Sequence, residues 1–393
     1  MALSDTGETV AALEGELTAF RRELHAHPEL AHAERRTTDR LAARLTASGV
    51  RLRLLTGTGL IADIGPVDPS YRVGLRADMD ALPLAERTGL PFASQSDGVC
   101  HACGHDVHVA AVLGAGLALQ QQADSLAAQG LGVRLIFQPA EEVTPGGSLS
   151  VIEQGGIEGV DAIFSIHCDP TLDVGRVGLR DGPITSATDS VTITLSGRGG
   201  HTSRPHLTQD LVYALGKVVT DVPAALSRRV DPRSGVALVW GTIRSGSAEN
   251  VIPSTGTVSG TLRMLDAQLW EDIEPLLEEL VHAVVRPYAV SATIEHRRGA
   301  PPVVNDPALV ARLRAAAELV LGPAAPTPTA QSLGGEDFAW YVQAVPGAMA
   351  RLGTRTPGGT TYDLHQGDLV VDERAVAIGA RLLLGVVTAH RPG

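Results

Sequence analysis

The sequence predicts an α/β protein: a mostly parallel sheet covered by helices, interrupted by a smaller ferredoxin-like domain of order β-α-β-β-α-β. Two observations support this fold class. In the first half, short runs rich in branched apolar residues alternate with segments of helical periodicity, as in parallel sheets. After residue 185 or so, the pattern changes to alternating strands and two amphipathic helices. We therefore expect two domains.

The first domain is expected to begin with two helices, at 8–30 and 34–49, because apolar residues recur there with helical spacing. Gly49 ends the second one, as glycine commonly does. An Ala- and Leu-rich segment at 107–128 predicts a third helix. The expected buried strands, bounded by turn-forming residues, are 71–80, 132–139 and 160–168.

The inserted domain is predicted from a second run of elements. In chain order these are strand 190–199, helix 208–226, strands 235–246 and 254–265, helix 266–285 and strand 291–299. Residues 299–306 resemble a return linker, and helical spacing resumes at 307–322. We therefore expect a discontinuous first domain, made of residues 1–184 and 300–393, and an inserted domain at 185–299.

Composition and charge narrow the class of protein. The chain has 393 residues, of which 44% are hydrophobic and 19% charged, as in globular proteins. A net charge of −12 without a basic, aromatic-rich cluster argues against nucleic-acid partners and against binding to an anionic membrane. The N-terminal segment is polar and acidic, so we expect a cytoplasmic protein. Three cysteines do not suggest a disulfide framework.

Metal-capable side chains follow several predicted strands. The carboxyl ends of parallel strands meet at one edge of a sheet, where ligands bind. Segments such as HACGHDVH (101–108) and FQPAEE (137–142) therefore deliver such groups to one place. The candidates are Asp78 and Asp80, Cys103 and His105, Glu141 and Glu142, and His167.

Each candidate also has an ordinary interpretation. Cys100 and Cys103 have C-x-x-C spacing, which also occurs in redox pairs and zinc knuckles. His101 and His108 could be core or surface histidines, and Cys168 a small buried apolar residue. As a set, thiolate, imidazole and carboxylate suit zinc, with manganese or cobalt as alternatives. Metal ions lower the pKa of bound water, and a spare carboxylate can accept its proton.

Six motifs occur in an order that resembles the hippurate hydrolase and indole-acetyl-amino-acid hydrolase branch of the aminoacylase and carboxypeptidase family of metal-dependent peptidases. The motifs are RADMDALPL, HACGHDVHVAAVLGAG, FQPAEE, GGHTSRPH, ENVIPSTGTVSGTLR and GGEDFAWY. The resemblance covers essentially the whole chain. It implies a two-metal hydrolase domain interrupted by a smaller lid domain, in a homodimer formed through the lid.

The resemblance also implies roles for individual residues. Glu141 would be the general base, while His201 would hydrogen-bond the oxyanion, in several family members across the dimer contact. Asn250 would bind substrate, and Asp80 would orient a metal ligand. Asp78 stands where other branches of the family have a histidine ligand, which the Cys103 thiolate would replace. The implied metal ligands are Cys103, His105, Glu142, His167 and His365.

The predicted function is therefore a metal-dependent amidohydrolase with two divalent metal ions that removes the N-acyl group from a small N-acyl amino acid or similar amide. A dipeptidase or aminopeptidase with the same metals is the alternative, as is a binding protein that has lost catalysis. Two departures from the family pattern leave substrate preference open. His365 is followed by QGDLVV, and the glutamate pair by VTPGG.

Overall fold

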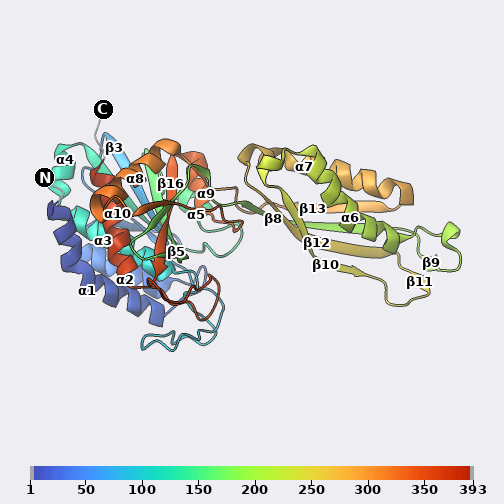
Figure 1. Ribbon diagram of the computed structural model, residues 1–393, viewed down its shortest axis with the longest axis horizontal. Helices are drawn as coiled ribbons and strands as arrows, with labels where there is room; N and C mark the ends of the chain where they lie inside the picture. Colours follow the sequence, from blue (N-terminus) through green and yellow to red (C-terminus); the bar gives the residue numbers. More distant parts are fainter. Residues whose placement is uncertain (1–3, 390–393) are drawn as a thin grey trace. The chain divides into compact units, whose positions relative to one another are not determined.

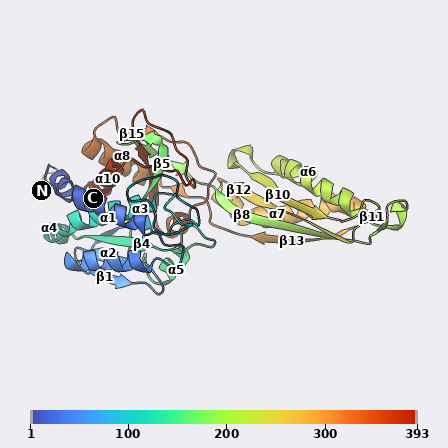
Figure 2. The ribbon, with the colours of Figure 1, turned by 90° about the horizontal axis from the view of Figure 1, so that it is seen from below.

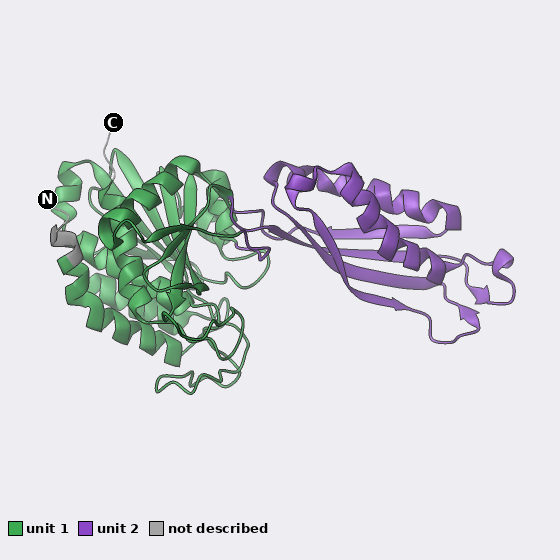
Figure 3. Cartoon of the chain, viewed as in Figure 1, with its two compact units in different colours: residues 1–182, 304–330, 337–393 green, residues 183–303, 331–336 purple. Residues whose placement is uncertain are grey.

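The computed structural model describes residues 4–389, and the chain divides into two compact units (Figure 3). Unit 1 holds the residues up to Gly182, then Val304–Ala330, and those from Asp337 onward. Unit 2 holds Pro183–Val303 and also Gln331–Glu336. The sequence did not predict this last segment. It joins unit 2 through backbone pairing, since Ser186 donates an N–H group to the carbonyl of Gly334.

Unit 1 contains an eight-stranded sheet with the order β1-β2-β4-β3-β5-β16-β6-β15 (Figure 1). Its strands are β1 (Arg51–Leu54), β2 (Leu60–Ile64), β3 (Tyr71–Asp78), β4 (Leu131–Gln138), β5 (Ala162–Asp173), β6 (Val177–Leu179), β15 (Pro326–Pro328) and β16 (Gly347–Arg355). The neighbours β4, β3, β5 and β16 are parallel to one another. The prediction of a mostly parallel sheet is confirmed, with short antiparallel neighbours added at both ends.

The helices of unit 1 are α1 (Ser4–Ala26), α2 (Arg35–Ala47), α3 (His105–Gln120), α4 (Ala123–Ala128), α5 (Ser148–Glu153), α8 (Pro307–Leu321), α9 (Phe338–Ala344) and α10 (Arg374–Thr388). The prediction of a single helix at 107–128 is wrong, because the chain turns between α3 and α4. The first helix also ends at Ala26 rather than residue 30, because Pro28 disfavours helical geometry in the residue before it. Within the described residues, no helix is long and apolar enough to span a membrane.

Helix α3 is almost entirely buried within unit 1, and it lies beside α1 and α10 (Figures 1 and 2). Its residues from His105 to Leu119 are all buried. Gly114 allows this close approach, since a Cβ atom there would lie 2.5 Å from Leu17 Cδ1 in α1 and 3.1 Å from Ala380 Cβ in α10. Packing on both sides of α3 fixes the position of its first residue, His105.

Strand β16 was not predicted from the sequence, although it lies between β5 and β6 inside the sheet. Eight of its nine residues are buried, from Gly347 to Thr354. Its sequence GAMARLGTR is rich in glycine and alanine, contains two arginines and has only one β-branched residue, which weakens the usual sequence signal of a strand.

Unit 2 has the element order β-α-β-β-α-β. Its main elements are β8 (Ala187–Ser196), α6 (Leu211–Arg229), β10 (Ala237–Ser245), β12 (Thr255–Met264), α7 (Ala267–Val285) and β13 (Ser291–Arg297). The four strands form an antiparallel sheet with the order β10-β12-β8-β13. A separate two-stranded ladder pairs β9 (Gly200–His201) with β11 (Val251–Ile252).

Candidate metal centre

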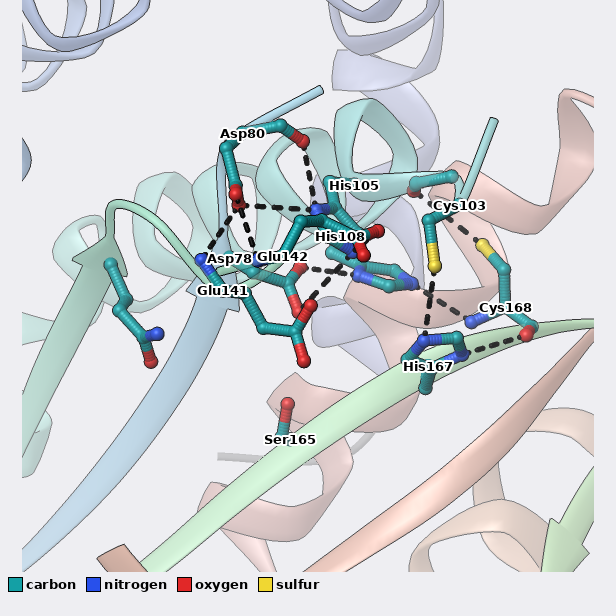
Figure 4. Close-up of polar contacts among 12 residues, drawn as sticks. Asp78, Asp80, Cys103, His105, His108, Glu141, Glu142, Ser165, His167 and Cys168 are labelled. Atoms are coloured by element: carbon teal, nitrogen blue, oxygen red, sulfur yellow. Dashed lines mark hydrogen bonds and ion pairs between the residues drawn. The ribbon is translucent and has the colours of Figure 1, made fainter. Parts of the chain in front are cut away.

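The predicted metal-capable residues of unit 1 gather at the carboxyl ends of β3 and β4 and beside the middle of β5, which extends to Asp173 beyond its predicted end at residue 168 (Figure 4). Asp78 is the last residue of β3, and Glu141 and Glu142 follow β4 directly after a short turn. His167 lies in β5, and His105 begins α3. The parallel order of these strands therefore brings together residues that lie far apart in the sequence.

In two histidines of the cluster, Nδ1 is bonded to a backbone oxygen, so Nε2 is the ring nitrogen that is available to a metal. The Nδ1 atom of His105 lies 2.9 Å from the backbone oxygen of Asp80, and that of His167 lies 2.8 Å from the backbone oxygen of Cys168. A carbonyl oxygen can only accept, so each Nδ1 carries the proton and donates it. Each Nε2 is then left with a free lone pair, the arrangement in which histidine binds metal.

The candidate ligand atoms lie close to one another. The Nε2 atom of His167 is 3.5 Å from Cys103 Sγ, and that of His105 is 3.7 Å from Glu142 Oε1. His365 Nε2 lies 3.4 Å from the same Glu142 oxygen. Three groups of such atoms each lie within 4.8 Å: Cys103, His105 and His167; Cys103, Glu142 and His365; and His105, Glu141 and Glu142.

These residues fit a metal ion on a further observation. His105 Nε2 and Glu142 Oε1 are buried and have no hydrogen-bond partner among the described residues. Buried polar atoms are nearly always satisfied, so two unsatisfied ligand atoms in one cluster fit a site that binds a cation. Burial also raises the pKa of the Cys103 thiol, and its thiolate therefore requires a neighbouring cation.

Cys100 differs from Cys103. Burial, followed by the charges of Glu86 and Asp106, raises the pKa of Cys100 to about 11. Its backbone pairs with Leu82, and its sulfur belongs to none of the candidate ligand groups in the described residues. All three cysteines are free thiols.

Asp80 holds the backbone of the glutamate pair. Its Oδ1 accepts the N–H of Glu141 at 3.0 Å, and its Oδ2 accepts the N–H of Glu142 at 2.9 Å. Both carboxylate oxygens are therefore occupied. Burial alone would raise the pKa of Asp80, but these hydrogen bonds and His105 outweigh burial and lower it.

Asp78 and His108 form a buried pair beneath the centre. Asp78 Oδ1 lies 2.6 Å from His108 Nδ1, and its Oδ2 lies 2.6 Å from the guanidinium of Arg76. The Nε2 atom of His108 accepts the N–H of Cys168 at 2.8 Å. Burial would raise the pKa of Asp78, but Arg76 and the two histidines lower it well below its usual range. His108 is thus a core histidine with both nitrogens bonded.

His365 lies in the loop between β16 and α10, and a backbone hydrogen bond joins this loop to the loop that contains Cys103. Its N–H donates to the carbonyl of Ala102 at 2.8 Å, and its own φ is 60°. The side chain is 55% exposed, unlike the other four candidate ligands. Spacing could not have identified His365, because contacts with residues far away in the sequence bring it to the cluster.

Glu34 is a residue of this region that sequence analysis missed. It is fully buried, and its carboxylate accepts the N–H of Ala140, directly before the glutamate pair, at 2.8 Å. It also accepts the Thr58 hydroxyl at 2.6 Å. Nothing in the local sequence distinguishes Glu34 from a solvated glutamate at the start of a helix.

His201 and Asn250 lie together in unit 2, whereas the other candidates lie in unit 1. His201 pairs with Val251 across the β9–β11 ladder, and the N–H of Thr202 donates to the carbonyl of Asn250 at 3.2 Å. Both side chains are exposed. The structure thus joins two residues that are separated by a helix and a strand in the chain.

The family model described as peptidase family M20/M25/M40 matches residues 74–389 of the chain. This match spans the candidate metal centre and both units. The chain belongs to this family. Within the M20/M25/M40 family, its similarity to individual proteins extends over nearly its full length.

Two curated relatives and one solved structure illustrate the similarity. The putative glutamate–cysteine ligase 2-3 of Rhodococcus jostii (strain RHA1) is 47% identical over 95% of this chain, but the chain spans only 46% of that relative's length. N-acetyl-L-cysteine deacetylase of Bacillus subtilis (strain 168) is 36% identical over 93% of this chain and 86% of the relative. A dinuclear metal binding peptidase from Bacillus subtilis superposes with a TM-score of 0.83 at 30% identity, covering 96% of this chain and 98% of the other.

Proposed function

We propose that this protein is a metal-dependent amidohydrolase that removes the N-acyl group from a small N-acyl amino acid. The observation that carries this proposal is the cluster at the strand ends, where two imidazole Nε2 atoms, a thiol and a glutamate converge next to a second glutamate. The relative named N-acetyl-L-cysteine deacetylase supports the substrate class. The ligase name of the Rhodococcus relative carries less weight, because less than half of that protein is matched.

Five residues would hold two divalent ions: Cys103, His105, Glu142, His167 and His365. When bound, such ions polarise a carbonyl group and lower the pKa of water. The mixed thiolate, imidazole and carboxylate set suits zinc, with manganese and cobalt as alternatives. The solved relative titled as a dinuclear metal binding peptidase supports two ions rather than one.

Glu141 would act as the proton carrier of the reaction. Its ligand oxygen lies within 4.8 Å of those of His105 and Glu142, so the carboxylate is close enough to serve the same site. It would accept a proton from the attacking water and deliver it to the leaving nitrogen. Asp80 would assist by fixing the backbone of Glu141 through the hydrogen bond described above.

His201 and Asn250 would contribute from unit 2, acting as a lid. An exposed imidazole can donate a hydrogen bond to the oxyanion that develops on the amide, and such donors stabilise the transition state more than the substrate. Asn250 lies beside it and would bind the substrate itself.

We also propose a cytoplasmic homodimer formed through unit 2. Its edge strand β10 exposes Val239 and Ile243, with 60% and 56% of their surfaces accessible, and these can cover one another in a dimer. The free state of all three cysteines supports a reducing compartment. Light scattering of the purified protein and cell fractionation would test these two points separately.

The proposed function is tested by metal analysis combined with a substrate panel. The metal-loaded protein should hydrolyse N-acyl amino acids, and chelation should abolish the activity. Free dipeptides of the same amino acids are the matched comparison. Cleavage of dipeptides in preference to N-acyl amino acids would contradict the proposal and favour a dipeptidase, while inactivity on both would favour a binding protein.

A further inference from the structure

Arg351 lies in β16, next to the candidate metal centre. In the parallel register of β16 and β5, Arg351 is the partner of His167. Partnered residues on neighbouring strands project from the same face of a sheet, and the strands lie about 4.8 Å apart. The Arg351 side chain therefore leaves the sheet beside a candidate metal ligand.

The Arg351 side chain is buried but unpaired. The residue is only 8% exposed, and no residue in the described part of the chain forms a hydrogen bond or ion pair with its guanidinium. Other buried or strand-end arginines differ: Arg76 pairs with Asp78 and Asp337, and Arg355 pairs with Asp173. Burying an unpaired charge costs free energy, so Arg351 requires another explanation.

The chemistry of Arg351 does not suit a metal ligand. A guanidinium has no lone pair that could bind a cation, and its charge opposes a second cation bound nearby. An anion that lies beside both positive charges compensates for this repulsion.

The backbone beside Arg351 is closely packed on one side. Its partner across the antiparallel pair with β6 is Gly178, where a Cβ atom would lie 3.0 Å from Arg351 Cβ and 2.9 Å from Thr329 Cβ. The guanidinium nitrogens are not sealed from solvent, since none is among the fully buried unbonded atoms of the described residues. A small anion can therefore reach Arg351.

We propose that Arg351 binds a carboxylate group of the substrate and thereby selects acidic N-acyl compounds over neutral ones. This inference rests on the proposed function and adds the residue that recognises the substrate. A guanidinium matches a carboxylate through two parallel hydrogen bonds, which a neutral carboxamide cannot form equally well. The carboxylate belongs either to the amino-acid part or to a dicarboxylic acyl group, and substrates can separate the two.

The test compares substrate pairs that differ by one carboxylate. One pair is an N-acetyl amino acid and its carboxamide, and the other is an N-succinyl and an N-acetyl derivative of the same amine. The metal-loaded wild-type enzyme should prefer the acid in one pair. Arg351→Met should reduce that preference roughly 10- to 100-fold, mainly through KM, because it removes a charge-assisted hydrogen-bonded pair. Arg351→Lys should fall between, because lysine keeps the charge but not the planar geometry.

Arg355→Met is the matched control. It removes an arginine from the same strand, but one that is already paired with Asp173 at 2.7 Å, so the acid preference should not change. The metal content and the melting temperature of Arg351→Met should not fall below those of the wild type, because Arg351 has no protein partner to lose. A lower melting temperature with an unchanged acid preference would indicate a structural role and overturn the proposal.

A binding measurement separates this inference from the proposed function. Calorimetry with the metal-loaded Glu141→Gln protein should show tighter binding of the acid than of its carboxamide, and the added Arg351→Met change should abolish that difference. If carboxylates bind through Arg351 but no N-acyl compound is hydrolysed by the wild type, the proposed function alone fails. If binding does not depend on Arg351, the inference fails whatever the enzyme hydrolyses.

Discussion

The buried carboxylate of Glu34 accepts a hydrogen bond from the backbone N–H of Ala140 at 2.8 Å, and Ala140 has a φ of 57°. A residue other than glycine costs roughly 1–2 kcal/mol in this left-handed conformation. Asp80 binds the next two N–H groups, so two buried carboxylates hold three successive residues that end in the glutamate pair. The turn after β4 is thus shaped by acidic side chains from distant parts of the chain.

Glu34→Ala should therefore destabilise the protein and misplace the glutamate pair. The Ala140 N–H would lose its acceptor inside the protein, which costs roughly 1–3 kcal/mol of unfolding free energy. Denaturant unfolding measures this loss, and metal analysis should show weaker binding. Glu34→Gln keeps an oxygen that can accept the same N–H and serves as the control. Equal stability of Glu34→Ala and the wild type would contradict the importance of this contact.

The two adjacent glutamates should separate by role. Glu141→Gln should retain metal and lower kcat by roughly 10²–10⁴-fold, because it removes the proton acceptor and preserves the shape of the side chain. Glu142→Gln should instead lower metal content, since its oxygen lies among the ligand atoms. Steady-state kinetics at saturating metal, together with metal analysis, checks both. Near-normal kcat in Glu141→Gln would refute its assignment as the base.

The two cysteines of the C-x-x-C segment should behave differently. Cys103→Ala should lower metal content, because its sulfur lies 3.5 Å from His167 Nε2 in the candidate cluster. Cys100→Ala should leave metal content and activity nearly unchanged. Thiol reagents should modify the metal-free protein faster than the metal-loaded protein. Equal losses in the two variants would indicate that the cysteines act as a pair.

His201→Ala should lower kcat by roughly 10²–10³-fold, the usual cost of removing one donor to an oxyanion. Its metal content should stay at the wild-type level, because His201 belongs to unit 2, whereas all the proposed ligands belong to unit 1. Asn250→Ala is the companion variant, and its effect should appear partly in KM. Unchanged kcat in His201→Ala would remove this residue from the mechanism.

Mixing experiments can establish whether His201 acts within its own subunit. If it acts across a dimer, mixing inactive His201→Ala and inactive Glu141→Gln proteins should restore part of the activity through hybrid dimers. Subunit exchange must be demonstrated independently, for instance with differently labelled chains. Exchange without recovery of activity would show that His201 does not act on the partner's metal centre.

Local patterns in the sequence determined the parallel sheet and the β-α-β-β-α-β order of unit 2. Periodicity reports which side of each segment is buried, and this information is present within a few neighbouring residues. The same logic located Asp78 and Glu142, which stand at or just after the end of a strand, and His167, which lies in the middle of β5. Strand β16 escaped prediction because its glycine- and alanine-rich sequence depends on its neighbours for its conformation.

Tertiary structure decided which distant residues share an environment. Glu34 reaches Ala140 and His365 reaches Ala102 through contacts that no local spacing encodes. The tertiary structure places Arg351 opposite His167 in the register of β16 and β5. It gives the guanidinium no hydrogen-bond or ion-pair partner among the described residues. Sequence periodicity records burial along a single element. Strand order and loop packing depend on the whole chain, and they determine which residues contact each buried side chain.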